Sequence, residues 1–538
     1  MRAMRMLGWM LLVGSASAAW AAPDCAGLKA TRMSEAQITE ASSIAPGAFA
    51  PADPAAAPAA IFSALPAFCR VVGVIRPTAD SQIGFELWLP ENWNGRYLQA
   101  GNGGFAGKIN YVGLVPGVAN GFAAASTDDG HVAGEMDAGW ALGHPEKVID
   151  FGYRAVHLTS VISKRVVQAY YRHDASHTYF SGCSDGGREG LMEAQRYFDD
   201  FDGYLVGAAG SDFTGVMTYL LSLGQISSSI KTPFTLTQIQ AVQDAARAQC
   251  HAQDGVIENP LQCRFDVAAL QCKGAADGKC LSAEQVQAAT QIYAGARGGR
   301  LQTRLTPGFQ LAVGNEVAQW PALVGPVPKE MDHPRPVGEM FGKAFWPLIV
   351  YGNPGMDFRT LDLARAAGEA RERVGGLVNA ADPNLAAVRA SGKKIIQYHG
   401  WADGVVPAPY ATGYYGAVEK YLGQDNRDFY RLFMAPGVLH CGMGPGPNAF
   451  GISYDTRLTP FEPERHLLAA LVQWVEKGAA PERIVATKYQ DDDPSKPVVR
   501  TRPLCPWPKV ARWSGKGSKD EAHNFVCAAA DVSHSAPK

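Results

Sequence analysis

The sequence has little charge, and neither sign prevails. Its 538 residues include 49 Lys and Arg against 51 Asp and Glu, a formal net charge of −2, and charged residues make up only 19% of the chain. A face that binds nucleic acid usually gathers an excess of Lys and Arg. We therefore expect no nucleic-acid partner. The length predicts two domains, or one domain with a large insertion.

Long apolar runs are missing after the start of the chain. A membrane-spanning helix needs roughly 20 apolar residues, and the one candidate run, Met6 to Val13, is shorter. Arg2 and Arg5 precede it, and small residues follow at Ala19-Trp20-Ala21. This pattern is typical of a signal peptide, predicted at residues 1–22, rather than of a single membrane anchor. We expect a secreted or periplasmic protein with no membrane partner.

The sequence also lacks any Cys-x-x-Cys pair, which speaks against a structural zinc site. It does contain ten cysteines. An even number of cysteines in an exported chain favours disulfides over reactive thiols. The spacing alone does not fix how they pair.

One glycine-rich stretch has the pattern Gly-x-Ser-x-Gly, at Gly182-Cys183-Ser184-Asp185-Gly186. A β-prone run precedes it and a helix-prone run follows, which is the context of a nucleophile elbow. There the serine occupies a sharp turn at the N-terminus of a helix, whose free N–H groups face the reaction site. The alternative is an ordinary turn, since the chain has 58 glycines.

The segments around this motif follow the order of an α/β-hydrolase. A glycine loop, residues 101–107, comes after a predicted strand, where such enzymes place an oxyanion N–H. Asp403 follows the predicted strand 393–400, and His440 follows the strand 429–434. Ser184, Asp403 and His440 thus have the order and the loop positions of a catalytic triad. His131 is interpreted as a supporting loop residue.

The other predicted elements set the domain boundaries. Residues 23–75 are predicted to form an irregular N-terminal segment ending in the first strand. The α/β catalytic domain comprises residues 23–212 and 375–538, and residues 213–374 form a mostly helical inserted lid. Further strands are predicted at 68–75, 83–89, 96–99, 122–126, 205–210 and 498–502, and helices at 150–171, 410–421 and 463–477.

Two cysteines adjoin the candidate triad, Cys183 before the serine and Cys441 after the histidine. A disulfide holds two Cα atoms about 5.5–6 Å apart. A bond between these cysteines would therefore hold Ser184 and His440 side by side. In the lid, an aromatic cluster of Phe341, Phe345 and Trp346 is interpreted either as lid core or as the lining of a pocket for an aromatic substrate.

The sequence resembles the tannase and feruloyl esterase family. Matching motifs are residues 182–189, Tyr398 to Asp403, 429–434 and 440–447. The resemblance implies an α/β-hydrolase with a lid, the Ser184–His440–Asp403 triad, and oxyanion N–H groups from Asp185 and from Gly103 or Gly104. It also implies the pairs Cys183–Cys441, Cys25–Cys69, Cys250–Cys263, Cys272–Cys280 and Cys505–Cys527.

The family's lid usually carries a calcium loop, and here the sequence departs from the pattern. The stretch from Cys250 to Pro260 retains one Asp-Gly unit, which leaves Asp254, the Val256 carbonyl and Glu258 as candidate ligands. Calcium prefers six to eight oxygens. A structural Ca²⁺ would therefore need water or other residues to complete its ligands, and the chemistry requires no cofactor.

The resulting hypothesis is a secreted serine esterase that hydrolyses small esters of aromatic acids, of the feruloyl, galloyl or terephthalate monoester type. One alternative is a non-catalytic ligand-binding protein on the same fold. Another is a peptidase or acyltransferase that uses the same three residues. An intact triad disfavours the binding protein, while a peptidase or acyltransferase is separated only by its substrates.

Overall fold

The computed structural model describes residues 24–53, 57–252, 255–275, 277–329, 331, 333–453 and 459–530. The predicted signal peptide lies outside the described residues. In the described part, no helix has both the length and the apolar character required to cross a membrane.

A nine-stranded sheet forms the centre of the molecule, in the order β1-β2-β3-β5-β4-β6-β7-β10-β11. The neighbours in the first part of this order, β1-β2-β3-β5, run antiparallel, and those in the second part, β5-β4-β6-β7-β10-β11, run parallel. The strands are β1 (Ala36–Ile44), β2 (Phe68–Ile75), β3 (Ile83–Pro90), β4 (Arg96–Ala100), β5 (Ala123–Thr127), β6 (His177–Cys183), β7 (Gly203–Gly207), β10 (Lys394–Gly400) and β11 (Tyr430–Ala435).

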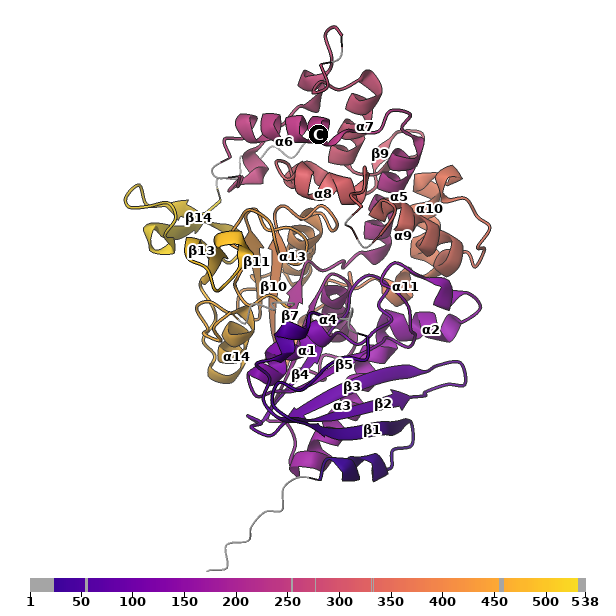
Figure 1. Cartoon of the computed structure of the whole chain (residues 1–538), viewed down its shortest axis with the longest axis vertical. Helices are drawn as coiled ribbons and strands as arrows, with labels where there is room; N and C mark the ends of the chain where they lie inside the picture. Colours follow the sequence, from indigo (N-terminus) through magenta and orange to yellow (C-terminus); the bar gives the residue numbers. More distant parts are fainter. Residues whose placement is uncertain are drawn as a thin grey trace, which may run out of the picture.

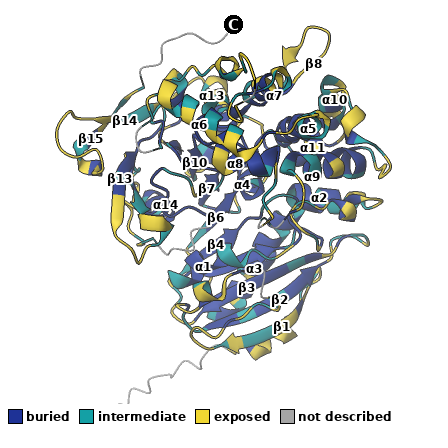
Figure 2. Ribbon diagram, turned by 45° about the horizontal axis from the view of Figure 1, so that its top comes forward, coloured by how far each residue is buried: buried dark blue, intermediate teal, exposed yellow. Residues whose placement is uncertain are grey.

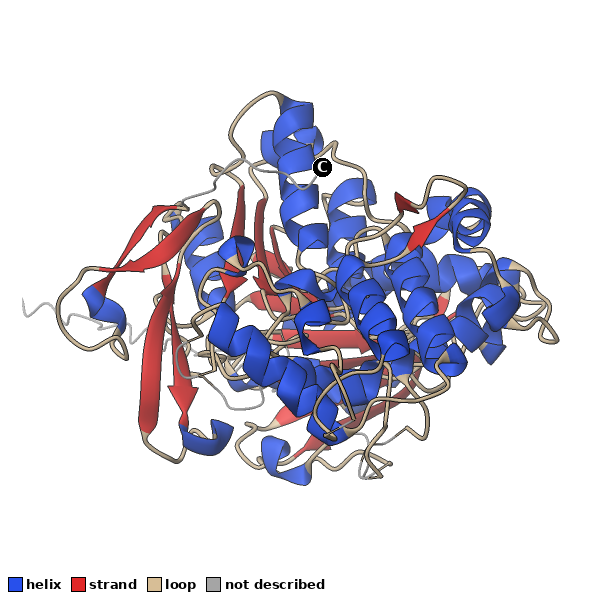
Figure 3. Cartoon of the chain, turned by 90° about the horizontal axis from the view of Figure 1, so that it is seen from above, coloured by secondary structure: helices blue, strands red, loops and turns tan. Residues whose placement is uncertain are grey.

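Helices cover both faces of this sheet (Figure 3). Successive strand residues alternate between two buried clusters, as Tyr179 and Phe180 of β6 show. Because both faces are covered, the parallel strands are apolar on both sides and appear dark blue in Figure 2. The surrounding helices are α1 (Tyr111–Ala119), α2 (Pro145–Ile149), α3 (Ala155–Tyr171), α4 (Asp185–Arg196), α11 (Gly375–Val378), α12 (Ala386–Ala390), α13 (Pro409–Leu422) and α14 (Leu467–Lys477).

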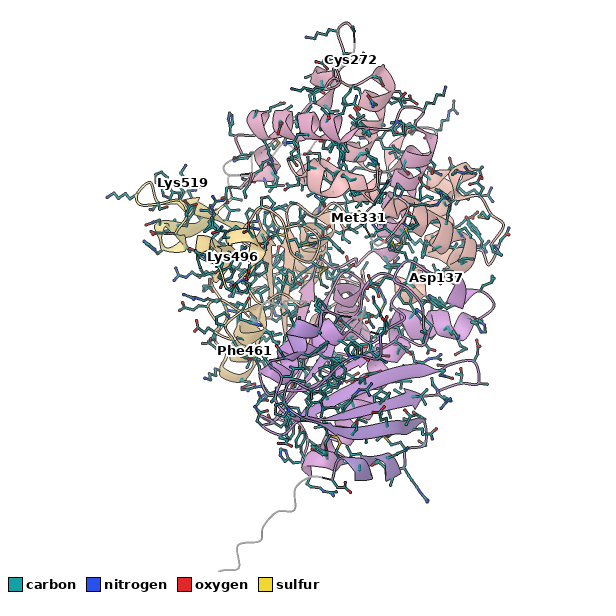
Figure 4. The ribbon with its side chains drawn as sticks, viewed as in Figure 1. Asp137, Cys272, Met331, Phe461, Lys496 and Lys519 are labelled. Carbon is teal, nitrogen blue, oxygen red and sulfur yellow. A yellow bond between two sulfur atoms is a disulfide. The ribbon has the colours of Figure 1, made fainter. Side chains whose placement is uncertain are left out.

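Residues 213–374 form a helical segment at the top of Figure 1. Cys272 marks its far tip (Figure 4). The two ends of the segment meet, because Ala380 donates its N–H to the Ser211 carbonyl at 2.8 Å. Its elements are α5 (Phe213–Ser229), α6 (Leu236–Gln249), α7 (Ala283–Ala294), β8 (Arg297–Gly298), β9 (Thr303–Arg304), α8 (Glu316–Leu323), α9 (Val337–Ala344) and α10 (Leu363–Arg373).

Two antiparallel hairpins end the described chain and project to the left in Figure 1. They are β12 (Ile484–Tyr489) with β13 (Val498–Leu504), and β14 (Lys509–Trp513) with β15 (Phe525–Ala529). The Cys505–Cys527 disulfide joins the end of the first hairpin to the second.

Most predicted strands lie where the sequence places them, but two expectations need correction. The N-terminal segment is not wholly irregular, since β1 pairs antiparallel with β2 along most of its length. The helix expected from Pro463 begins only at Leu467. A turn at Glu462 and the extended backbone of His466, with φ −129°, separate the proline from the helix.

Candidate active site

The turn between β6 and α4 holds Ser184 in a strained conformation, with φ 63° and ψ −119°. A Cβ on Gly182 would lie 2.4 Å from the Gly186 carbonyl oxygen, and a Cβ on Gly186 would lie 2.7 Å from the Asn102 carbonyl oxygen. Both distances are too short for any side chain, so the two glycines are required. The Ser184 N–H donates to the Gly207 carbonyl at 3.0 Å, which ties the elbow to β7.

The structure brings the three predicted triad residues into one hydrogen-bonded chain. Ser184 Oγ lies 2.8 Å from His440 Nε2, and His440 Nδ1 lies 2.8 Å from Asp403 Oδ2. Ser184 and His440 are partly exposed, whereas Asp403 is buried. Ser184 and His440 are therefore accessible from solvent, whereas Asp403 is shielded from water.

Asp403 is held as a carboxylate although it is buried. Burial alone would raise its pKa, but His440, His399 at 3.4 Å and the N–H of Val406 hold the pKa below its usual value. The N–H groups of Val405 and Val406 donate to Oδ1 at 2.9 Å, which leaves Oδ2 for His440. The arrangement fixes His440 with its proton on Nδ1 and its Nε2 directed at the serine.

The predicted glycine loop lies against the elbow. The Gly186 N–H donates to the Asn102 carbonyl at 2.7 Å, so residue 103 follows directly after a contact with α4. In the described part of the chain, the N–H groups of Gly103 and Gly104 donate no hydrogen bond. Asp185 is the first residue of α4, where a helix N–H has no partner within the helix. These are the N–H groups that the resemblance assigns to the oxyanion hole.

The end of this loop is held by residues that follow β5. Phe105 donates its N–H to the Glu135 carbonyl at 2.7 Å, and His131 donates from Nε2 to the Phe105 carbonyl at 2.7 Å. Burial lowers the pKa of His131 to about 4, so its ring is neutral at neutral pH. Gly104 has a φ of 60°, and a Cβ there would lie 2.2 Å from the Glu135 carbonyl. His131 is thus a supporting residue of the loop.

The ten cysteines form five disulfides, in the pairs that the resemblance implies. Cys183 and Cys441 are bonded with their Cα atoms 5.9 Å apart, so β6 and the loop of His440 are joined covalently. The other bonds are Cys25–Cys69, Cys250–Cys263, Cys272–Cys280 and Cys505–Cys527. Five disulfides fit a protein of an oxidising compartment.

The aromatic cluster of the helical segment forms core. Phe345 and Trp346 are fully buried, and the Phe341 ring packs on Phe105 of the glycine loop with centroids 5.0 Å apart. Because both rings are fully buried, the structure favours the interpretation of Phe345 and Trp346 as core over that of a pocket lining. Phe341 is 7% exposed, and its contact with Phe105 supports the loop from the side of the helical segment.

The one candidate calcium ligand with a described carboxyl group, Glu258, is paired with an arginine. Glu258 Oε1 lies 2.7 Å from Arg502 Nη2, and the Arg502 guanidinium lies over the Phe525 ring at 4.0 Å. Asp254 is outside the described residues, and the Val256 side chain is buried. A guanidinium already neutralises Glu258 and would repel a cation, so the described residues do not fit a calcium site.

Three buried side chains near the elbow have roles that the sequence did not reveal. Asn102 donates from Nδ2 to Asp129 Oδ2 at 3.1 Å, and its N–H donates to Glu189 Oε2 at 3.0 Å. Glu189 belongs to the Gly-Gly-Arg-Glu motif, and Asp129 follows a strand. Those positions were visible in the sequence, but their contact was not.

The comparisons with known proteins decide the family. The model of the "Tannase and feruloyl esterase" family matches residues 69–528. The chain belongs to the tannase and feruloyl esterase family. It is 38% identical to an uncharacterised esterase of Xanthomonas campestris, over 98% of this chain and 94% of that one. It is 31% identical to a probable feruloyl esterase B-2 of Aspergillus flavus, over 81% and 83%.

Solved structures agree with this membership of the tannase and feruloyl esterase family. Feruloyl esterase B from Aspergillus oryzae superposes with a TM-score of 0.85 at 28% identity, covering 94% of this chain and 99% of that one. A tannin acyl hydrolase from Aspergillus niger, at 21% identity and a TM-score of 0.71, shares the fold over 94% and 95%. The protein is therefore an α/β-hydrolase and a carboxylic ester hydrolase, and its substrates are small esters.

Proposed function

We propose that this esterase hydrolyses esters of aromatic acids through an acyl-enzyme on Ser184. The observation that carries the proposal is the continuous hydrogen-bonded chain from Ser184 through His440 to Asp403. The names of the relatives, which include feruloyl esterases and a tannin acyl hydrolase, support an aromatic acid as the acyl group.

The reaction begins when Ser184 Oγ attacks the ester carbonyl carbon. His440 Nε2 takes the serine proton, and the resulting imidazolium is stabilised by the Asp403 carboxylate. The carbonyl oxygen becomes an oxyanion, which accepts hydrogen bonds from the N–H of Asp185 and of Gly103 or Gly104. Loss of one such donor typically slows catalysis by roughly 100- to 1000-fold.

The tetrahedral intermediate then collapses, the carbon–oxygen bond of the ester breaks, and His440 returns the proton to the leaving alcohol. Water enters, His440 takes one of its protons, and the hydroxide attacks the acyl carbon. The acid leaves and Ser184 recovers its proton. Each step uses groups of this chain and water, so no cofactor is required.

Three further features belong to the proposal. Residues 213–374 act as a lid over the catalytic domain of residues 23–212 and 375–538, and the choice of acid and alcohol depends on that lid. Residues 1–22 direct export, in keeping with the five disulfides. The expected partners are small aromatic esters, with neither nucleic acid nor membrane.

The test compares the wild type with Ser184→Ala on methyl gallate, methyl ferulate and a terephthalate monoester. We expect a loss of kcat on the order of 10⁶-fold in the variant. The matched control is Ser160→Ala, which removes a buried hydroxyl of α3 that has no hydrogen-bond partner among the described residues. Unchanged turnover by Ser184→Ala would refute the mechanism.

Two measurements separate the alternatives. A fluorophosphonate probe should label the wild type at Ser184 and leave Ser184→Ala unlabelled, whereas a binding protein would show no labelling in either. Hydrolysis of the corresponding aromatic amides, or transfer of the acyl group to an added alcohol at a rate above hydrolysis, would favour a peptidase or an acyltransferase.

A further inference from the structure

Behind the elbow lies a buried group of charged side chains that the proposed mechanism does not use. Three carboxyl groups and one guanidinium meet there, and all four residues are at most 3% exposed. One oxygen of each carboxyl group lies within 4.8 Å of the others. They are Asp129, Asp185, Glu189 and Arg188.

Arg188 and Asp185 form an ion pair within this group. Arg188 Nε and Nη2 lie 2.5 and 3.0 Å from the two oxygens of Asp185. Two further guanidinium N–H groups, on Nη1 and Nη2, donate to the carbonyls of Gly152 and Phe151, at 2.7 and 3.0 Å. Among the described residues, the hydrogen bonds of the guanidinium thus go to Asp185 and to backbone carbonyls, and none goes to the other two carboxyl groups.

Those two carboxyl groups, on Asp129 and Glu189, lie next to each other, with one oxygen of each within 4.8 Å of the other. Asp129 Oδ1 and Glu189 Oε1 have no N–H or hydroxyl partner among the described residues. A hydrogen bond between two carboxyl groups requires a proton on one of them. Two adjacent buried carboxylates would repel each other strongly, so the pair retains a single proton.

The other two oxygens of the pair hold Asn102 from both sides. Glu189 Oε2 accepts its N–H at 3.0 Å, and Asp129 Oδ2 accepts its side-chain Nδ2 at 3.1 Å. The Asn102 carbonyl accepts the Gly186 N–H at 2.7 Å. Asn102 is the residue before Gly103, so these bonds set the direction of the Gly103 N–H.

We propose that Asp129 and Glu189 are positioning residues which share one proton and thereby hold Asn102, so that the Gly103 N–H faces the reacting carbonyl. This rests on the proposed function, because it concerns the oxyanion hole of the same site. Burial raises the pKa of both carboxyl groups, that of Asp129 well above its usual value and that of Glu189 to about 7. The charge of Glu189 raises the pKa of Asp129 further, and the charge of Asp185 raises that of Glu189. The shared proton is therefore retained in acid and is lost as the pH rises.

Other charged groups around the pair do not replace this proton. On α4, burial raises the pKa of Glu193 well above its usual value, which disfavours its charged form, and Asp185 is paired with Arg188. His131, on the loop of Asp129, is neutral at these pH values. Lys164 and Asp200 are charged neighbours of Glu193: Asp200 raises its pKa and Lys164 lowers it. At high pH the pair becomes a dianion next to the developing oxyanion, and kcat should fall while KM changes little.

The test is the pH dependence of kcat in four variants. Glu189→Gln and Asp129→Asn each reproduce the singly protonated pair, since an amide N–H replaces the shared proton and the net charge is kept. We expect Glu189→Ala to lose up to about 100-fold in kcat, because one oxyanion donor is misdirected. Glu189→Gln should recover most of that loss, and both amide variants should lack the alkaline decline of the wild type.

Glu193→Gln is the matched control. Glu193 is another buried carboxyl group of α4 with a raised pKa, but its charged neighbours are Asp200 and Lys164, and neither of its oxygens accepts a hydrogen bond from the glycine loop. It should keep the wild-type alkaline decline. The proposal is overturned if Glu189→Gln is as damaged as Glu189→Ala in folded protein, or if the decline persists in both amide variants.

Failure here is distinguishable from failure of the proposed function. Ser184→Ala decides the triad mechanism, whatever the shape of the pH profile. If that variant is inactive and the alkaline decline is unaffected by Glu189→Gln, the triad mechanism stands and the positioning role is refuted.

Discussion

Removing the disulfide next to the triad should lower stability and catalysis together. The Cys183→Ala/Cys441→Ala variant opens a loop with a sequence separation of 258 residues. In the chain-entropy description, such a cross-link stabilises the folded state by about 5.5 kcal/mol at 25 °C. For a chain of this size that corresponds to a decrease in Tm of about 5 °C if the protein unfolds as one unit.

The Cys272–Cys280 bond provides the matched control. Its sequence separation is 8, for which the same description gives about 2.5 kcal/mol, or about 2 °C in Tm. It lies at the far tip of the helical segment (Figure 4), away from α4 and the elbow at the centre of Figure 1. Its removal should leave kcat unchanged.

The catalytic effect of the first variant is positional. Without the bond, His440 is held only by its loop and by Asp403, and a displacement of about 1 Å can cost roughly 100-fold in rate. The assay measures Tm by calorimetry and kcat per active site, counted by titration with the fluorophosphonate. Equal losses of Tm in the two variants, with kcat intact in both, would refute the reasoning.

Two further predictions concern the acid and the calcium question. Asp403→Asn should lower kcat by about 10⁴-fold by favouring the wrong tautomer of His440. The folded-state pKa of Asp403 is below its usual value, so the charged carboxylate stabilises the folded protein above about pH 4, and this stabilisation disappears as the pH falls through the folded-state pKa. Denaturant titrations should therefore show that the wild type is more stable than the variant at neutral pH and loses this difference in acid. Chelation of calcium with EGTA should leave Tm unchanged, since Arg502 pairs with Glu258, and a clear fall in Tm that added Ca²⁺ restores would contradict the ion-pair interpretation.

The parts of the site that were predictable from sequence depend on local signals. A strand followed by Gly-x-Ser-x-Gly identifies Ser184, and strand ends before Asp403 and His440 give the order of the triad. Such patterns involve neighbouring residues, so they are legible without coordinates. Cys183 and Cys441 are likewise sequence neighbours of Ser184 and His440, and a bond between them predicts that these two distant residues lie side by side.

The contacts that were missed join distant segments or lack a periodic pattern. Asp129 and Glu189 belong to different elements, and nothing local to either shows that they meet. Strand β1, at the edge of the sheet, contains Ala, Ser and Gln at positions that are exposed or partly exposed and has a single buried residue, Ile38, so it shows no apolar alternation. The Arg502–Glu258 pair joins the helical segment to the last hairpins and leaves no mark in the calcium-loop motif itself.

The helical segment leaves and re-enters the fold at almost one point, because the Ser211 carbonyl bonds to the Ala380 N–H. Strands β7 and β10 pair directly across that interruption. A segment whose two ends lie close together can be exchanged without distorting the rest of the fold, because insertions between adjacent ends are generally tolerated. The elbow and the histidine loop could therefore stay fixed by their own disulfide while lids from related esterases are transplanted, which makes chimaeras a direct route to new ester preferences.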